Sequence, residues 1–367
     1  MPAFCGPSVI EESCEGTMNR ADLEVISAST QDRRGIFLGA AEKLGTTAEN
    51  VEKDFWVCWI LDALFHQLPR ERPRLLFKGG TSLAKGFGLI PRFSEDIDIT
   101  VFRDDLGHAA SVEELEVLSR KKRQQKLDAI KTSCRSYIGE QLQLGLSGVI
   151  ERTFTAARTP IQANSLTPDD GDPDGQSLLF KYPTVFEEPE HYVQRVVRIE
   201  SGAKSALEPH RDVEVTPYLA TEVPKLDLSA RGITAVIPER TFWDKIVILH
   251  GQRASFEARG VLRRGGERIS RHYYDAYMVA KTGVGVAALQ DRPLGIDCAR
   301  HARMFFYRPD NDLGAAVEGR FSILPPAGMQ RDLRRDYEGM AGMIFGEAPS
   351  FDDVLMGITA LDGELRQ

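Results

Sequence analysis

Residues 77–100 read FKGGTSLAKGFGLIPRFSEDIDIT, and this stretch decides both the fold and the candidate site. It begins with an apolar residue and a Gly-Gly-Thr-Ser turn at Gly79–Ser82. It ends with alternating Asp and Ile residues, as expected for a strand in which Asp96 and Asp98 share one face while the isoleucines enter the core. The stretch therefore predicts a strand, a tight turn into a helix, and a second strand that carries two carboxylates.

The two aspartates and the turn have complementary chemistry. Neighbouring carboxylates repel each other unless a cation lies between them. Oxygen ligands of this kind suit Mg²⁺ or Mn²⁺, and Mg²⁺ usually binds through one or two carboxylates together with substrate phosphates. In the turn, bare backbone N–H groups and two hydroxyls can hold a phosphate at a helix start, and the residues concerned are Gly79, Gly80, Thr81 and Ser82. Together these features predict a metal-assisted site for phosphoryl or nucleotidyl transfer from an NTP.

The same stretch resembles a known family. KGGTSL followed by RFSEDIDI is similar to the signature of the AbiEii toxin-like nucleotidyltransferases, which belong to the polymerase-β-type nucleotidyltransferase superfamily. The resemblance extends over roughly residues 50–280. It implies an α+β fold, with a polymerase-β-like core built on a mixed sheet and a C-terminal helical domain.

Further residues acquire expected roles through this resemblance. Lys245, in ERTFWDKIVIL, resembles the family lysine that contacts the NTP phosphates. Asp275, in RHYYDAY, resembles an acidic residue near the triphosphate with a base or positioning role, and Arg271 lies on the same helical face, where it could pair with Asp275 or bind the nucleotide. Glu200 ends an apolar strand where the third metal carboxylate of the superfamily would fall. Lys53, in EKDFW, lies either on a solvated helix edge or within reach of the substrate.

The resemblance implies a metal-dependent nucleotidyltransferase that moves NMP from an NTP to an acceptor hydroxyl. The expected acceptor is tRNA, and the expected role is that of the toxin in a toxin–antitoxin or phage-defence pair, with a cognate antitoxin as partner. Two alternatives stay open. Asp96–Thr100 also satisfies the DxDxT pattern of haloacid-dehalogenase-like phosphatases, although the polar Arg92–Glu95 lead-in does not fit the buried strand expected there. The other alternative is a non-catalytic nucleotide- or RNA-binding protein on the same fold, against which the intact acidic and lysine motifs count.

The composition of the chain limits which classes of protein are possible. The chain has 367 residues, 42% of them hydrophobic and 27% charged, as in ordinary globular proteins. A formal net charge of −8 argues against coating nucleic acid through bulk positive charge but allows a local basic patch. Five dispersed cysteines without a CxxC pair favour reduced thiols. Because the chain also lacks an apolar run of membrane-spanning length, we expect a cytoplasmic protein without a membrane partner.

Along the chain, the sequence predicts three parts. Residues 1–28 are expected to be loosely ordered, residues 29–237 to form the nucleotidyltransferase core, and residues 238–367 to form a helical domain that completes the active site. The core prediction includes a strand at Ile150–Phe154 and a long helix that starts at a capping box at Ser111 and runs toward Ile138. Two basic segments, Ser119–Lys126 and Arg259–Arg271, lie either on solvated surfaces or along an RNA backbone.

Overall fold

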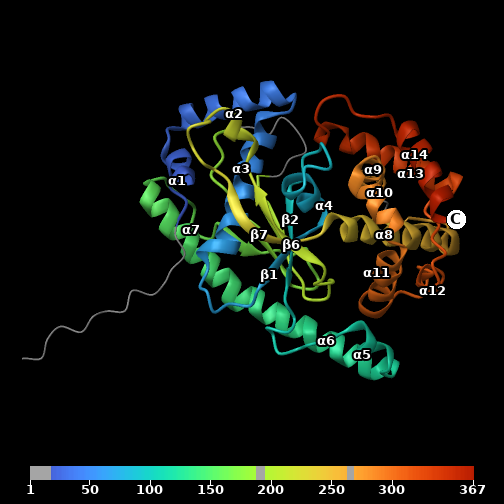
Figure 1. Ribbon diagram of the computed structural model, residues 1–367. Coiled ribbons are helices and arrows are strands. Elements are labelled where there is room, and N and C mark those ends of the chain that lie inside the picture. Colours follow the sequence, from blue (N-terminus) through green and yellow to red (C-terminus); the bar gives the residue numbers. More distant parts are fainter. Residues whose placement is uncertain (1–17, 187–194, 263–267) are drawn as a thin grey trace, which may run out of the picture.

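A computed structural model describes residues 18–186, 195–262 and 268–367. At its centre lies a mixed sheet of seven strands in the order β3-β4-β5-β2-β1-β7-β6 (Figure 1). β1 is antiparallel to β2 and parallel to β7, and β2 is parallel to β5, whereas the remaining neighbours are antiparallel. The strands are β1 (Leu75–Lys78), β2 (Asp96–Val101), β3 (Leu166–Pro168), β4 (Ser177–Phe180), β5 (Val197–Glu200), β6 (His210–Val215) and β7 (Ala230–Val236).

The signature stretch forms the central hairpin of this sheet. β1 leads directly into the short helical turn α4 (Gly79–Thr81) and the π-helical segment Ser82–Gly86, and the chain then returns as β2. Lys78 faces Asp98 across the two strands in the β1–β2 register. As the alternation predicts, Ile97 and Ile99 are fully buried, whereas the two aspartates face the opposite side of the sheet.

The helices before residue 160 pack with the sheet in the largest of the hydrophobic cores (Figure 1). α3 is buried along nearly its whole length, and Trp56 and Trp59 pack there edge to face. Thr47 caps α3 by accepting a hydrogen bond from the Asn50 N–H at 3.3 Å. The helices are α1 (Arg20–Ser27), α2 (Thr30–Leu44), α3 (Ala48–Asp62), α5 (Val112–Glu116), α6 (Arg120–Ser136) and α7 (Gln143–Ala157).

From Pro238 onward the described chain is helical and packs around a second core, on one side of the sheet (Figure 1). The helices are α8 (Pro238–Arg259), α9 (Ser270–Ala280), α10 (Gly283–Gln290), α11 (Arg292–Phe305), α12 (Leu313–Val317), α13 (Ala327–Met340) and α14 (Phe351–Leu365). The segment before β2 joins this part to the sheet. The Phe93 N–H donates to the Met343 carbonyl at 2.7 Å, and the Phe345 N–H donates to the Pro91 carbonyl at 3.0 Å.

Three local predictions are wrong. Residues 20–27 are not loose but form α1, because Val25 and Ile26 bury their side chains against the larger core; residues 1–17 lie outside the described part of the chain. Ile150–Phe154 belongs to α7 rather than to a strand. The capping box at Ser111 is confirmed, but its helix ends at Glu116 and Ser119 starts a new one.

No helix of the described residues has both the length and the apolar character needed to cross a membrane. Cys58, Cys134 and Cys298 are buried free thiols, as the dispersed spacing predicted.

Candidate active site

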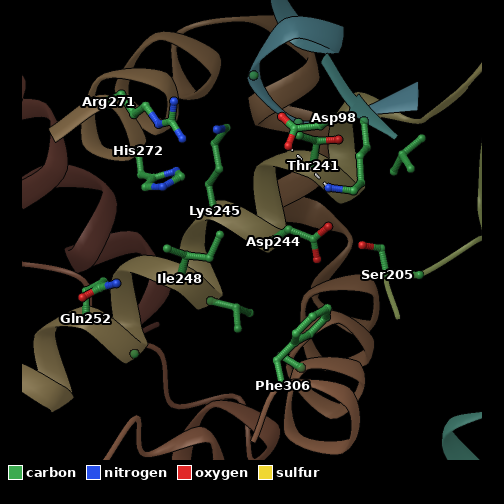
Figure 2. A pocket seen from close by; sticks show the side chains of 18 of the residues that line it. Asp98, Ser205, Thr241, Asp244, Lys245, Ile248, Gln252, Arg271, His272 and Phe306 are labelled. Atoms are coloured by element: carbon green, nitrogen blue, oxygen red, sulfur yellow. Dashed lines mark ion pairs between the residues drawn. The ribbon is translucent and has the colours of Figure 1, made fainter. Parts of the chain in front are cut away.

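A cavity of about 470 Å³ lies where the central hairpin meets α8 and α9. Asp96 and Asp98 reach it from β2, Gly79 and Gly80 from the turn, and Lys245 from α8. Figure 2 shows Lys245 between His272 and Asp98, with Arg271 above His272. The structure thus brings together in one cavity the two motif halves that the sequence predicted to be neighbours.

The two positions of the turn require glycine because other side chains approach its backbone closely. Gly79 has φ +77°, and a Cβ there would lie 2.1 Å from an oxygen of Asp98. A Cβ on Gly80 would lie 2.5 Å from Nη2 of Arg92. Only glycine therefore lets the turn pack directly against the carboxylate and the guanidinium.

The hydroxyls that follow the glycines are already engaged. The Thr81 hydroxyl donates to the main-chain carbonyl of Asp96 and contacts the Ser94 hydroxyl at 2.7 Å. The Ser82 hydroxyl donates to the Gly79 carbonyl at 2.9 Å. Both side chains are buried and neither lines the cavity, so the surface offered to a phosphate here is that of the glycines.

Three carboxylates lie on adjoining strands next to the turn. Asp98 faces Glu200 in the register of β2 and β5. Burial raises the pKa of Asp96, and the nearby Glu95 raises it further. Burial likewise raises the pKa of Glu200, with Asp98 and Asp96 adding to the effect. Each of the three carboxylates also lies near a cation, since Asp96 is 3.2 Å from Arg268, Asp98 is 3.7 Å from Lys78 and Glu200 is 2.9 Å from Arg198.

The three carboxylates bear on the predicted metal. Within the described ranges, no three His, Cys, Asp or Glu side chains are grouped closely enough to form a complete metal site. Glu200 pairs with Arg198 at 2.9 Å and does not line the cavity. Asp96 and Asp98 do line it, and two carboxylates suffice for a cation whose other ligands are substrate phosphates. The residues present fit such a shared site better than a site made by protein alone.

Lys245 belongs to a buried ionic triad. Asp275, which is fully buried, accepts hydrogen bonds from Arg92 Nε at 2.7 Å and Nη2 at 2.8 Å, and its Oδ2 lies 2.7 Å from Lys245 Nζ. Burial alone would raise the Asp275 pKa, but Arg92 and Lys245 outweigh it and hold this pKa well below its usual range. Burial, together with the Arg92 charge, lowers the pKa of Lys245 despite Asp275. The triad fixes two cationic side chains at the cavity wall.

Arg271 lines the cavity but does not have the predicted partner. Its guanidinium lies 4.0 Å from Asp96, whereas the ion pairs of Asp275 go to Arg92 and Lys245. The neighbouring His272 also lines the cavity, and burial lowers its pKa far below the usual range, so its ring is neutral. The one-turn spacing in α9 placed Arg271 correctly but could not show that Asp275 is satisfied from other elements.

Sequence reasoning missed the contacts that hold the carboxylate strand in place. Lys53 is neither solvated nor facing substrate: it is buried and pairs with Glu95 at 2.8 Å. The other Glu95 oxygen lies 2.9 Å from Arg268, which also reaches Asp96 at 3.2 Å. Next to Lys53, Asp54 pairs with Lys85 at 2.8 Å behind the glycine turn. A signal for these contacts was present, because EKDFW and RFSED are both motif segments. From α3, Lys53 pairs with the segment before β2 and Asp54 pairs with the segment that follows the glycine turn.

These features define the class of protein. A mixed sheet that presents two aspartates beside a glycine turn, faced by a buried lysine from a following helix, is the arrangement expected of a nucleotidyltransferase. A family model described as "Nucleotidyl transferase AbiEii toxin, Type IV TA system" matches residues 62–356. The chain belongs to this family and is a nucleotidyltransferase with an NTP as substrate.

Among solved structures, a similar one is MenT4, a nucleotidyltransferase toxin from Mycobacterium tuberculosis. The two share 15% sequence identity over 90% of this chain and 97% of that chain, with a TM-score of 0.43. No curated protein matches.

Proposed function

We propose that this toxin nucleotidyltransferase moves NMP from an NTP to an acceptor hydroxyl on RNA, with tRNA as the expected acceptor, in a reaction that needs Mg²⁺ or Mn²⁺. The observation that carries the proposal is the shared cavity, which Asp96, Asp98, the glycine turn and Lys245 all line. In the reaction, the acceptor oxygen forms a bond to the α-phosphorus, the bond to the bridging oxygen breaks, and pyrophosphate leaves. Positioning and charge neutralisation supply most of the acceleration in such transfers.

The triphosphate is assigned to the charged end of the cavity. Gly79 and Gly80 offer a surface without side chains, and the compact charge of Lys245 suits a phosphate oxygen. Arg271 is placed to bind the same phosphates because it lines the cavity beside Lys245. Thr81 and Ser82 support the turn through their backbone-directed hydrogen bonds.

We assign Asp275 a positioning role rather than that of a base. Its low pKa makes it a poor proton acceptor, and Arg92 and Lys245 occupy both of its oxygens. By holding the Lys245 ammonium at 2.7 Å, it fixes the direction in which the remaining N–H bonds of that group point. Asp275 therefore acts on the nucleotide through Lys245.

The metal is assigned to Asp96 and Asp98, with Glu200 as a neighbour that adds negative charge. A divalent cation there would neutralise phosphate charge and polarise the bond that breaks. The position of Asp96 and Asp98 on one face of β2, where both line the cavity, supports this assignment, because a cation between neighbouring carboxylates relieves their repulsion.

The acceptor RNA is assigned to the basic side of the site. A smaller cavity of about 200 Å³ lies next to the first, and Arg268, Arg271 and Arg335 are among its lining residues. In a chain of net charge −8, such a local group of arginines is suited to a phosphate backbone. In α6, Arg120, Lys121 and Lys122 are exposed and offer a further basic surface. As in other type IV systems, we expect a cognate antitoxin to restrain the toxin, in a toxin–antitoxin or phage-defence pair.

The test is a transfer assay with total tRNA, Mg²⁺ and each NTP labelled at the α-phosphate, repeated with EDTA. We expect labelled RNA only with the metal present, and none with Asp96→Asn or Asp98→Asn variants that remain folded. Label on the protein instead of the RNA would contradict the proposal that RNA is the acceptor. Full transfer in EDTA would contradict the proposal that the reaction needs a metal. Phosphate release from a generic ester, or nucleotide binding without turnover, would support the phosphatase or the non-catalytic alternative.

A further inference from the structure

The main cavity continues beyond the motif residues toward a less charged end. Thr241, Lys245, Ile248 and Gln252 all line it and follow one face of α8. Seven residues separate Lys245 from Gln252, which corresponds to about 10 Å along the helix axis. Figure 2 shows Asp98 at one end of the cavity and Gln252 at the other, with Lys245 and Ile248 between them. The cavity is therefore long enough for a ligand that extends well past the phosphate-binding groups.

Two amide side chains at this far end have unused hydrogen-bonding capacity. The amide oxygens of Gln252 and Asn311 are buried, and neither has a hydrogen-bond partner in the part of the chain that the structure describes. An amide can both donate and accept hydrogen bonds. Because an unpaired buried polar group is unfavourable, the site is suited to a ligand that brings both donors and acceptors.

The wall that carries Asn311 is already in place. Ser255, on α8, donates to Asp310 at 2.8 Å, and the His250 ring nitrogen lies 3.0 Å from the Asp312 carbonyl. The absence of a side chain at Gly251 allows the approach, because a Cβ there would lie 3.0 Å from Cβ of Asn311. The segment after α11 is thus fixed against α8 on both sides of Asn311.

Apolar side chains also line the cavity near these amides. Ile248 precedes Gln252 by one turn of α8, and Leu313 follows Asn311 by two residues. Apolar side chains beside a few polar groups are the usual lining of a pocket for a small organic ligand.

We propose that this end of the cavity is the nucleobase subsite, in which Gln252 and Asn311 hydrogen-bond to the edge of the base and thereby select among NTPs. Ile248 packs against a face of the base. The proposal rests on the proposed function, which places the triphosphate at the Lys245 end of the same cavity. It goes further by assigning nucleotide selectivity to two residues outside the family motifs.

The test compares kcat/KM for the four NTPs in the wild type and in Gln252→Leu and Asn311→Leu, which remove the hydrogen bonds at similar volume. Each variant is expected to lose about 3- to 10-fold in kcat/KM for the preferred NTP relative to the least preferred one, the effect of one neutral hydrogen bond. Gln162→Leu, at an exposed amide, is the matched control and should leave the ratio unchanged. If Gln252→Leu does not fold, Gln252→Glu takes its place in the test, because it keeps the shape of the side chain but loses the N–H donor.

Binding of non-hydrolysable NTP analogues, measured by calorimetry, gives a readout that does not depend on turnover. The four analogues should rank by affinity as the four NTPs rank by kcat/KM. The Gln252→Leu and Asn311→Leu variants should again discriminate less between them than the wild type does. If the wild type transfers nucleotide but both variants keep the wild-type ratios, the subsite assignment is overturned while the proposed function stands. If the wild type neither binds nor transfers any NTP, the proposed function fails, and the subsite assignment fails with it.

Discussion

Replacing Asp275 by asparagine tests the buried triad most sharply. The substitution keeps the size of the side chain but removes the charge that compensates both Arg92 and Lys245. All three side chains are nearly inaccessible, with exposed fractions of 0% for Asp275, 3% for Arg92 and 6% for Lys245. Breaking a buried ion pair by removing one partner costs about 3–5 kcal/mol. Because two cations lose their partner here, we expect Asp275→Asn to fall in the upper half of that range.

The assay is urea unfolding followed by tryptophan fluorescence, since Trp56, Trp59 and Trp243 are all buried. Asp352→Asn, which breaks an exposed pair with Arg334, is the matched control and should change the free energy of unfolding far less. The Asp275 contribution should be complete at neutral pH. Because its pKa is depressed in the folded state, this contribution should shrink as the pH falls below about 4. If Asp275→Asn were as stable as the Asp352→Asn control, the claim that the triad stabilises the folded state would be refuted.

Three further predictions concern single positions. Gly79→Ala should abolish transfer because its Cβ would clash with Asp98, whereas Gly107→Ala, at a similar φ of +76° with open space around it, should lose only about 1–2 kcal/mol of stability. Burial raises the folded-state pKa of Glu52 to about 7, so between about pH 4.5 and 7 the folded protein holds a proton that the unfolded chain has lost. The free energy of unfolding should therefore fall as the pH rises through this range. Glu52→Gln should reduce this pH dependence in unfolding experiments. Arg271→Ala should raise KM for the NTP by about 10-fold or more, the loss of a charged hydrogen bond, with a smaller change in kcat.

What could be read from the sequence was governed by local patterns. The strand with Asp96 and Asp98 was predictable because side chains alternate, and the turn because consecutive glycines tolerate a left-handed φ and close contact. The helix with Lys245 has a proline at its first turn, and this position of a proline is a local signal for a helix start. The strand predicted at Ile150–Phe154 failed because its apolar residues belong to a longer helical period, with Leu146, Val149, Ile150, Thr153, Phe154 and Ala157 buried on one face.

What could not be read depends on tertiary contact. Arg92 and Asp275 are 183 residues apart, and no local rule indicates that one neutralises the other. Lys53 was ambiguous for the same reason, because its partner Glu95 is on a different element and burial decides the pairing. The helical spacing predicted that Arg271 could pair with Asp275. Spacing alone does not reveal that Asp275 pairs with Arg92 and that Arg271 lies near Asp96 instead. In each case the motif was visible and only its partner was missing.

The most direct test of the central claim compares NTPs labelled at the α- and γ-phosphates in the presence of Mg²⁺. If Asp96, Asp98, the glycine turn and Lys245 bind one nucleotide for nucleotidyl transfer, the α-label should appear on the acceptor and the γ-label in pyrophosphate. Asp98→Asn should stop the transfer while its unfolding midpoint stays close to that of the wild type. Transfer of the γ-label to the acceptor, or α-label transfer that survives in a folded Asp98→Asn variant, would contradict the account.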